Sequence, residues 1–235
     1  MPLLGMYFDP MYFAILGPGM LLALWATFKV KTTFARYRRE RVASGMTGAE
    51  TAREILRRNN LHDVKVVETS GMLSDHYDPR TRTVRLSPDV YRLPSVASVA
   101  VAAHEVGHAL QHARGYAPLA LRSAAVPLAN LGSFLPWILI AVGMWLQAMT
   151  WVYAGIILFA GVVFFQFVTL PVEFNASKRA RAQLADFCLV SERDAVGVKK
   201  VLFAAALTYV AGAITAVLTL LYFLLRAGLL GGRRN

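Results

Sequence analysis

The sequence predicts a mainly α-helical membrane protein in which four transmembrane helices carry a small α+β lobe. Hydrophobic residues make up 56% of the 235 residues and charged residues 17%, so the apolar share exceeds that of ordinary soluble domains. Four apolar segments are each long enough to cross a bilayer, which requires about 20 helical residues. None of them contains an acidic or basic side chain, and they are residues 11–28, 131–149, 152–170 and 201–225.

The first apolar segment is predicted to be a retained anchor rather than a cleaved signal peptide. A signal peptide carries positive charge ahead of its apolar core, whereas here Lys29, Lys31 and Arg36 follow the segment. Residues 1–30 are therefore assigned to a first transmembrane anchor.

The distribution of basic residues predicts how the chain is oriented in the membrane. The net charge is +11, and of the 25 Lys and Arg residues fifteen lie in residues 31–122 and six in residues 173–200. Cytoplasmic loops carry such an excess, so both segments are expected in the cytoplasm and both termini outside. Topology and attraction to anionic lipid explain this basicity, and the basic residues do not alternate with aromatic residues as in a nucleic-acid platform. Nucleic acid is therefore not an expected partner.

The lobe is expected to begin with helices. Residues 31–41 are interpreted as a basic helical stem that continues from the first anchor. Thr47 and Glu50 then stand three residues apart, which is the spacing of a capping box. This pattern predicts a helix that runs to about Asn59.

The middle of the lobe is expected to hold a small sheet followed by one longer helix. Residues 64–69 and 81–87 are rich in β-branched or alternating residues and predict a β-hairpin or two strands of a small sheet. The stretch between them is rich in turn-forming residues. Ser95 then begins a helical pattern over residues 96–113, which Gly115 ends.

The predicted helix 96–113 contains the sequence HEVGH, in which two histidines stand four residues apart. Residues four apart lie on one face of a helix, so the His104 and His108 rings can reach the same zinc ion. Glu105 lies at the edge of that face, where it can take a proton from a water molecule that zinc has made more acidic. His112 continues the face by one more turn, and we expect it at the rim or among the residues that support the ligands.

A catalytic zinc ion usually has three protein ligands and one open position, so a third ligand must come from elsewhere in the chain. Between His108 and Glu173 the chain crosses the membrane twice and returns to the side on which it started. Glu173 follows the third span and is predicted to open a helix that also presents Ser177 and Arg181. The rival carboxylates are Asp186, Glu192 and Asp194, and the alternative is that Glu173 only favours a helix N-terminus. The metzincin pattern is excluded because Gln111 and Arg114 replace its glycine and third histidine.

With HEVGH and the string PVEFNAS at residues 171–177, the chain resembles the YugP-like family of membrane-bound neutral zinc metallopeptidases of bacteria. The similarity covers nearly the full length and includes residues 6–10 and 74–79. More distantly, the chain is similar to the HtpX-type and CAAX-prenyl zinc proteases, which pair HExxH with a downstream E-[FY]-x-A-D motif. Glu173, Phe174 and Ala176 match that motif, whereas Ser177 stands where those relatives have aspartate.

This resemblance implies a gluzincin-like lobe that binds one Zn²⁺ ion through His104, His108 and Glu173. In such lobes a strand before the zinc helix borders the substrate, so residues 64–69 or 81–87 are expected beside the cleft. His76 is either a donor to the transition state or a turn histidine with a structural hydrogen bond. Arg181 either contacts substrate or faces solvent and lipid.

The predicted division of the chain follows from these segments. Residues 1–30 form the anchor, 31–130 the cytosolic lobe, 131–172 a transmembrane hairpin, 173–200 a cytosolic helix with the third ligand, and 201–235 the fourth transmembrane helix and a basic tail. The only cysteine, Cys188, excludes an intramolecular disulfide framework and a thiolate zinc cluster, and is interpreted as a small packed side chain.

The predicted function is hydrolysis of peptide bonds in membrane-associated polypeptides at the cytoplasmic face of the bacterial inner membrane. Zinc-activated water would attack, with Glu105 acting first as general base and then as general acid. The alternative is a zinc-containing membrane scaffold or adaptor that does not cleave, which would not need Glu105. A zinc transporter would place ionisable ligands within the spans, and the spans contain none.

Overall fold

The structure is a computed structural model that describes residues 9–71 and 74–230. Residues 6–8 of the family-like start and Arg233 and Arg234 of the basic tail therefore lie outside the described residues. The chain divides into two compact units, each built from several stretches of sequence. The apolar unit comprises Met1–Ala26, Leu121–Leu170 and Thr208–Asn235, and the lobe comprises Thr27–Ala120 and Pro171–Leu207.

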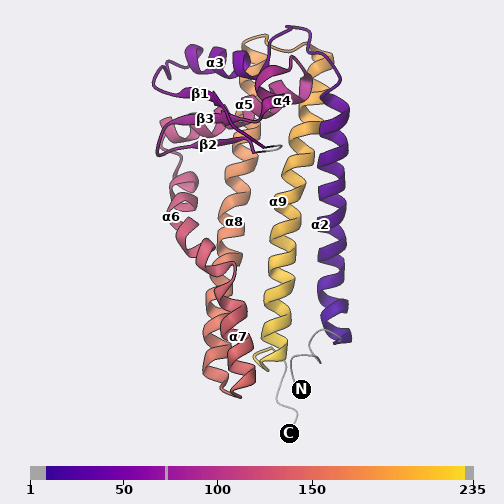
Figure 1. Cartoon of the computed structure of the whole chain (residues 1–235), viewed down its shortest axis with the longest axis vertical. Coiled ribbons are helices and arrows are strands. Elements are labelled where there is room, and N and C mark those ends of the chain that lie inside the picture. Colours follow the sequence, from indigo (N-terminus) through magenta and orange to yellow (C-terminus); the bar gives the residue numbers. More distant parts are fainter. Residues whose placement is uncertain (1–8, 72–73, 231–235) are drawn as a thin grey trace. The chain divides into compact units, whose positions relative to one another are not determined.

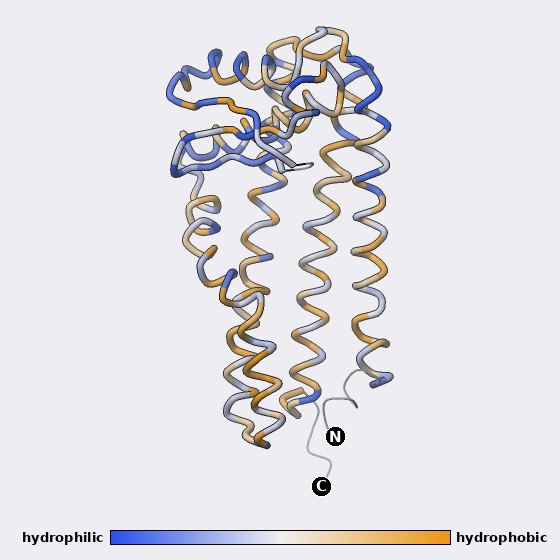
Figure 2. The backbone as a smooth tube through the Cα atoms, in the orientation of Figure 1, coloured by the Kyte–Doolittle hydropathy of each residue, from blue (hydrophilic) through white to orange (hydrophobic). Residues whose placement is uncertain are grey.

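Four stretches of the described residues are long and apolar enough to cross a membrane, which confirms the predicted number of spans. They are Pro10–Tyr37, Ala117–Trp145, Met149–Asp186 and Glu192–Arg226. Hydrophobic residues dominate α7 (Leu135–Trp145) and the adjoining first part of α8 (Met149–Asp186) (Figure 2). The five-segment division of the chain remains a prediction, because contacts define two units and no membrane boundary.

The second span differs from its predicted form because it is made of two helices. α6 (Ala117–Gly132) ends before Ser133, and α7 begins at Leu135 with Pro136 at a starting position. Proline has no N–H and is favoured in the first turn of a helix, where that N–H would have no partner within the helix, so Pro136 fits the start of α7.

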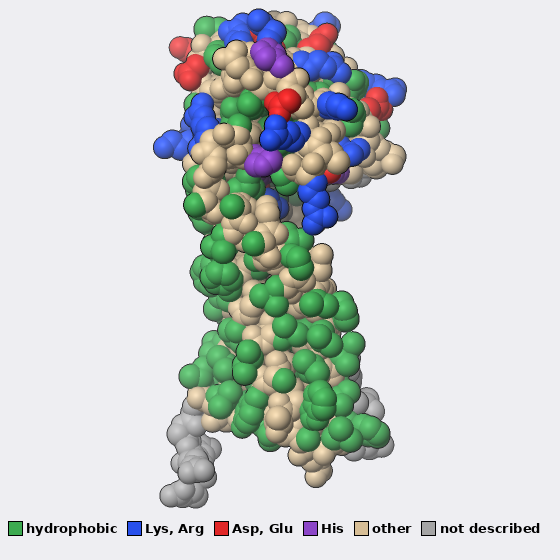
Figure 3. All heavy atoms as spheres, turned by 90° about the vertical axis from the view of Figure 1, so that its left-hand side faces the viewer, with side chains coloured by type: hydrophobic (Ala, Val, Ile, Leu, Met, Phe, Trp, Pro, Cys, Tyr) green, Lys and Arg blue, Asp and Glu red, His purple; other side chains and the backbone are tan. Residues whose placement is uncertain are grey.

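The helices of the apolar unit pack closely and leave an apolar exterior. A Cβ atom on Gly143 of α7 would lie 2.8 Å from the backbone nitrogen of Val152, and one on Gly155 of α8 would lie 2.9 Å from the Pro136 carbonyl. Small residues allow this approach, as is usual between membrane helices. On the face of this unit seen in Figure 3, hydrophobic side chains cover the surface, as contact with lipid requires.

The described residues of the lobe form three strands and three shorter helices, one of which is α4 (Pro88–Arg92) (Figure 1). The strands are β1 (Lys65–Glu68), β2 (His76–Asp78) and β3 (Thr83–Leu86), in the order β1-β3-β2. β3 pairs in parallel with β1 and antiparallel with β2. The hairpin alternative for residues 64–69 and 81–87 was wrong, because parallel strands cannot be joined by a tight turn. The stretch between them contains β2, which is an edge strand of only three residues.

α3 (Gly48–Arg58) begins at the capping box that the sequence predicts. The Glu50 backbone N–H donates to Thr47 Oγ1 at 3.2 Å, and the Thr47 N–H donates to Glu50 Oε2 at 2.8 Å. Gly48 then lets α3 approach α5 (Val96–Ala113), because a Cβ atom there would lie 2.9 Å from the Ser98 carbonyl oxygen. The capping box therefore sets the start of the helix that supports α5.

α5 is the central helix of the lobe and has the predicted bounds. Ser95 caps it by accepting the Ser98 N–H at 3.1 Å. Most of its apolar residues are buried, including Val99 and Val106, yet Glu105, His108 and Gln111 are buried as well. Burying polar groups without partners is costly, so these side chains must be satisfied by neighbouring groups. Lys, Arg, Asp and Glu instead gather on the exposed surface of the lobe (Figure 3).

The structure corrects three further details of the prediction. α2 (Pro10–Tyr37) ends four residues before the predicted end of the basic stem at residue 41. α8 continues through Pro171, so Glu173 lies within a helix and does not open one. Proline removes one backbone hydrogen bond, which a long membrane helix tolerates when neighbouring groups compensate. Cys188 is exposed and has a φ of +54°, so it is not the packed side chain that we expected.

The capping box provides a test of this fold. We expect Thr47→Ala to lower the stability of the lobe by about 1 kcal/mol, because the Glu50 N–H loses its acceptor. Thr47→Ser keeps the hydroxyl oxygen and should retain most of the stability. Thermal unfolding of the three proteins in detergent measures the difference, and equal midpoints for Ala and Ser would contradict this role of the cap.

Candidate metal site

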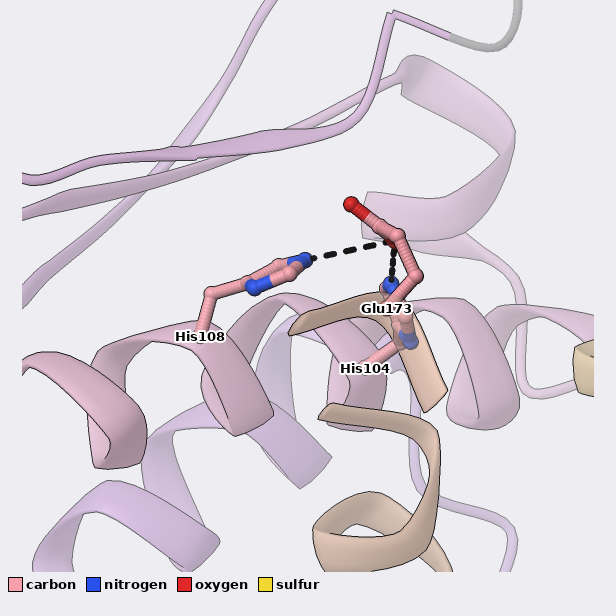
Figure 4. A group of neighbouring side chains, drawn as sticks. All are labelled: His104, His108 and Glu173. Atoms are coloured by element: carbon pink, nitrogen blue, oxygen red, sulfur yellow. Dashed lines mark hydrogen bonds and ion pairs between the residues drawn. The ribbon is translucent and has the colours of Figure 1, made fainter. Parts of the chain in front are cut away.

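Three side chains from two helices converge in the lobe (Figure 4). His104 and His108 lie one turn apart on α5, with ring centroids separated by 4.8 Å. Glu173 projects toward them from α8, and its Oε2 lies 3.2 Å from His104 Nε2 and 3.7 Å from His108 Nε2. One ligand atom from each residue lies within 4.8 Å of the others. The sequence-predicted ligands are thus together in space.

The chemistry of these three groups fits a divalent metal ion such as zinc. Two imidazoles and one carboxylate form a donor set that zinc uses in catalytic sites, where a fourth position stays open. Glu173 is 2% exposed and His108 7% exposed, so a charge shared among them is shielded from water. The arrangement of one helix turn and one carboxylate can therefore bind a metal ion, as the sequence predicts.

The site depends on a close approach of α5 to α8. A Cβ atom on Gly107 would lie 2.6 Å from the Ala176 carbonyl oxygen and 3.2 Å from the Ala176 Cα. Both neighbouring atoms belong to the backbone of α8 and cannot rotate away. A glycine between the two histidines is consequently required for Glu173 to reach them.

Residues behind the ligands hold the imidazole rings by their other nitrogen. His104 Nδ1 lies 3.2 Å from Ser177 Oγ, and His108 Nδ1 lies 3.0 Å from Gln111 Oε1. Both Nε2 atoms therefore face Glu173. Sequence reasoning singled out Ser177 as a residue that could support the ligands or contact substrate, but it missed Gln111, which entered only as a departure from the metzincin pattern. A buried polar residue three positions after a ligand histidine is the signal that could have found it.

Glu105 lies beside the three ligands, and its environment favours proton exchange. Burial raises the pKa of its carboxyl to about 7; the neighbouring His104 opposes this rise, and the charges of Glu173 and Asp75 add to it. The backbone N–H of Tyr77 favours the ionised form. Asp75 is itself held by Ser87, whose N–H donates to Asp75 Oδ1 at 2.7 Å. A carboxyl with a pKa near 7 can both accept and release a proton at neutral pH.

Three other residues that the sequence singled out, His112, His76 and Arg181, have contacts or surroundings of their own. The Tyr77 hydroxyl lies 2.9 Å from His112 Nδ1, so His112 contacts β2 and not the three converging groups. The exposed His76 has Nδ1 2.8 Å from the Ser74 carbonyl oxygen. Arg181 lines a groove of about 610 Å³ together with Lys178. Whether these residues contact substrate remains a prediction.

The rival carboxylates do not join the converging group. Asp186 and Glu192 are exposed. Asp194 is buried, but its Oδ2 accepts the backbone N–H groups of Ala43 at 3.0 Å and Ser191 at 3.1 Å. Among the described residues, only His104, His108 and Glu173 form a group that can hold a metal ion.

Comparison with known proteins is consistent with this geometry. A family model described as "Putative neutral zinc metallopeptidase" matches residues 12–228. The chain is 48% identical over 204 residues to a protein of Bacillus subtilis (strain 168) named "Putative membrane protease YugP", and the alignment covers 87% of this chain and 91% of that protein. No solved structure matches the chain significantly. The predicted resemblance to the YugP-like family is confirmed.

The close approach at Gly107 leads to a prediction about metal binding. We expect Gly107→Ala to push α8 away from α5, which costs about 1–3 kcal/mol of stability and lowers the zinc affinity. Gly17→Ala is a matched control, because no atom lies within 4 Å of a Cβ atom built there. Thermal unfolding and zinc titration of both variants check this, and unchanged zinc affinity in Gly107→Ala would contradict it.

Proposed function

The chain belongs to the neutral zinc metallopeptidase family, and from that premise we propose that it is an integral-membrane, zinc-dependent endopeptidase acting on membrane-associated polypeptides. The observation that carries this proposal is the convergence of His104, His108 and Glu173 beside the buried Glu105. An HExxH helix combined with a glutamate from a later helix is the ligand pattern of a gluzincin-like lobe.

In the proposed site, His104 Nε2, His108 Nε2 and a carboxylate oxygen of Glu173 hold one Zn²⁺ ion. When bound, zinc polarises the scissile carbonyl and lowers the pKa of water. Glu105 accepts the proton of the attacking water on its carboxylate and then delivers it to the leaving amide nitrogen. The raised pKa of Glu105 suits both steps, since one carboxyl must take up and release the proton in each cycle.

We further propose that β2 is the strand along which substrate lies. The resemblance implied residues 64–69 or 81–87 for this role, but β3 is the central strand and has both edges paired, which leaves β1 and β2 as the edge strands of the described sheet. β2 pairs on one side only, and it contacts α5 through Tyr77 and His112. An extended peptide that adds to such an edge forms backbone hydrogen bonds regardless of its sequence.

We propose that the protein is a multi-pass protein of the bacterial cytoplasmic membrane with its site facing the cytoplasm. The support is the excess of Lys and Arg in residues 31–122 and 173–200, which belong mainly to the lobe. The apolar unit then lies in the bilayer, and the site in the lobe can reach polypeptides that are associated with the membrane.

The role of Glu105 is tested by Glu105→Gln. We expect a fall in the cleavage rate of about 10²- to 10⁴-fold, because the amide cannot accept the proton, while zinc content stays at the wild-type level. Proteolysis of an unfolded membrane-protein substrate by purified protein, with zinc measured on the same samples, provides both readouts. Equal cleavage by the variant would reject the mechanism, and zinc binding by a wild-type protein that cleaves no polypeptide would favour the scaffold.

The third ligand is tested by Glu173→Ala. Zinc content should drop sharply, because two histidines alone leave the ion without its carboxylate. Glu192→Ala is the matched control, since Glu192 is an exposed carboxylate outside the converging group and its loss should leave zinc content unchanged. Full zinc occupancy in Glu173→Ala would show that another carboxylate is the ligand.

The orientation is tested with the single cysteine. Cys188 is exposed and lies in the lobe, so a membrane-impermeant maleimide should label it in inverted vesicles and leave it unlabelled in intact spheroplasts. In a Cys188→Ser background, Gln147→Cys in the turn between α7 and α8 should show the opposite pattern. Labelling of Cys188 in intact spheroplasts would place the lobe outside.

A further inference from the structure

We propose that Gln111 is a positioning residue for the metal site, which holds His108 in the tautomer that leaves Nε2 free for the metal and ties that ring to α8. This inference rests on the proposed metal site and deepens it. Gln111 lies three residues after His108 on α5 and is fully buried. A buried amide in an alanine-rich helix needs partners for its oxygen and for both of its hydrogens.

The Gln111 amide has a complete set of partners. Its Nε2 donates to the Val172 carbonyl oxygen at 2.8 Å and to Asn175 Oδ1 at 3.0 Å. Its Oε1 lies 3.0 Å from His108 Nδ1. Two of these partners belong to α8 and one to α5, so a single side chain connects the two helices that carry the ligands.

Arg179 determines the direction of these hydrogen bonds, because its guanidinium group can only donate. Arg179 Nε donates to Asn175 Oδ1 at 2.7 Å, and a guanidinium has no acceptor. Asn175 therefore presents its oxygen to Gln111, and a carbonyl does the same at Val172. Both acceptors require the NH₂ end of Gln111, so its amide cannot be reversed without placing oxygen against oxygen.

These hydrogen bonds determine which ring nitrogen of His108 carries the hydrogen. Because Gln111 Oε1 is an acceptor only, His108 Nδ1 must carry the hydrogen between them. The neutral ring then keeps its lone pair on Nε2, the atom that faces Glu173. A histidine binds a metal through an unprotonated nitrogen, so the hydrogen-bond chain prepares this ligand before any ion arrives.

His104 is held in a different way. Its Nδ1 lies 3.2 Å from Ser177 Oγ, and a hydroxyl can either donate or accept. Ser177 supports the ring without selecting a tautomer. His108 is thus the ligand whose proton position the fold determines.

A second effect of Gln111 concerns Glu173. The Val172 carbonyl that Gln111 binds belongs to the residue directly before Glu173. The same amide therefore holds both the His108 ring and the backbone that carries the third ligand. Loss of this amide should loosen the two ligands together, whereas a residue that only fills space would leave the tautomer and the metal affinity unchanged.

The test uses Gln111→Met, which keeps the length and approximate volume of the side chain but removes all three hydrogen bonds. Gln183→Met is the matched control, because Gln183 lies on α8 ten residues after Glu173 and accepts a hydrogen bond from Asn59, the C-cap residue of α3, and not from a residue of the metal site. Full-length protein in detergent is examined for zinc affinity against a chelator, for thermal midpoint, and for histidine protonation by ¹⁵N NMR without zinc.

We expect zinc-free wild type to show His108 protonated at Nδ1, and Gln111→Met to lose this preference and to bind zinc about 10- to 100-fold more weakly. Gln183→Met should keep wild-type zinc affinity. Equal zinc affinity in Gln111→Met and wild type would overturn the inference. If Gln111→Met does not fold, the wild-type spectrum decides, because protonation of His108 at Nε2 would also overturn it.

These readouts separate this inference from the proposed function. If wild type and Gln111→Met bind zinc with equal affinity, the positioning role is rejected and the proposed metal site still stands. Loss of zinc binding in the variant without any protease activity in wild type supports the positioning role and rejects the peptidase. A wild type that binds no zinc rejects the metal site, and the NMR of the zinc-free protein still decides the tautomer.

Discussion

The contact between α5 and α8 at Gly107 and Ala176 is the constraint on which the rest of the lobe depends. A Cβ atom on Gly107 would lie 2.6 Å from a backbone oxygen, so the two helices are as close as their main chains allow. This spacing brings a carboxylate from one helix to two imidazoles of the other. It also lets the Gln111 amide reach the backbone of α8, which a wider separation would prevent.

The same contact concentrates polar groups in an otherwise apolar core. Glu105, His108, Gln111 and Glu173 are all buried on α5 and α8, although most of the other buried residues of these two helices are apolar. Such groups are stable only when they hydrogen-bond or share a charge, and here they do so mostly with one another. The core of the lobe therefore gives up some apolar packing in order to hold these polar side chains in fixed positions.

Local patterns in the sequence predicted much of this arrangement. The spacing of His104 and His108 placed them on one helix face, and Thr47 with Glu50 marked the start of α3, because both signals act within one or two turns. β2 was missed because three residues are too few to show alternation. The continuation of α8 through Pro171 was missed because proline is common at the start of a helix and unfavourable inside one. The contacts of Gln111 were missed because its partners on α8 lie more than 60 residues away in the sequence.

The distance along the chain between the ligands has a consequence for biosynthesis. His104 and His108 leave the ribosome well before Glu173, and two of the apolar helices are made in between. A nascent chain that has completed the first part of the lobe therefore holds an incomplete ligand set. The proposed metal site can therefore be completed only after both apolar helices between the ligands have been synthesised, so the order of the chain alone delays its assembly.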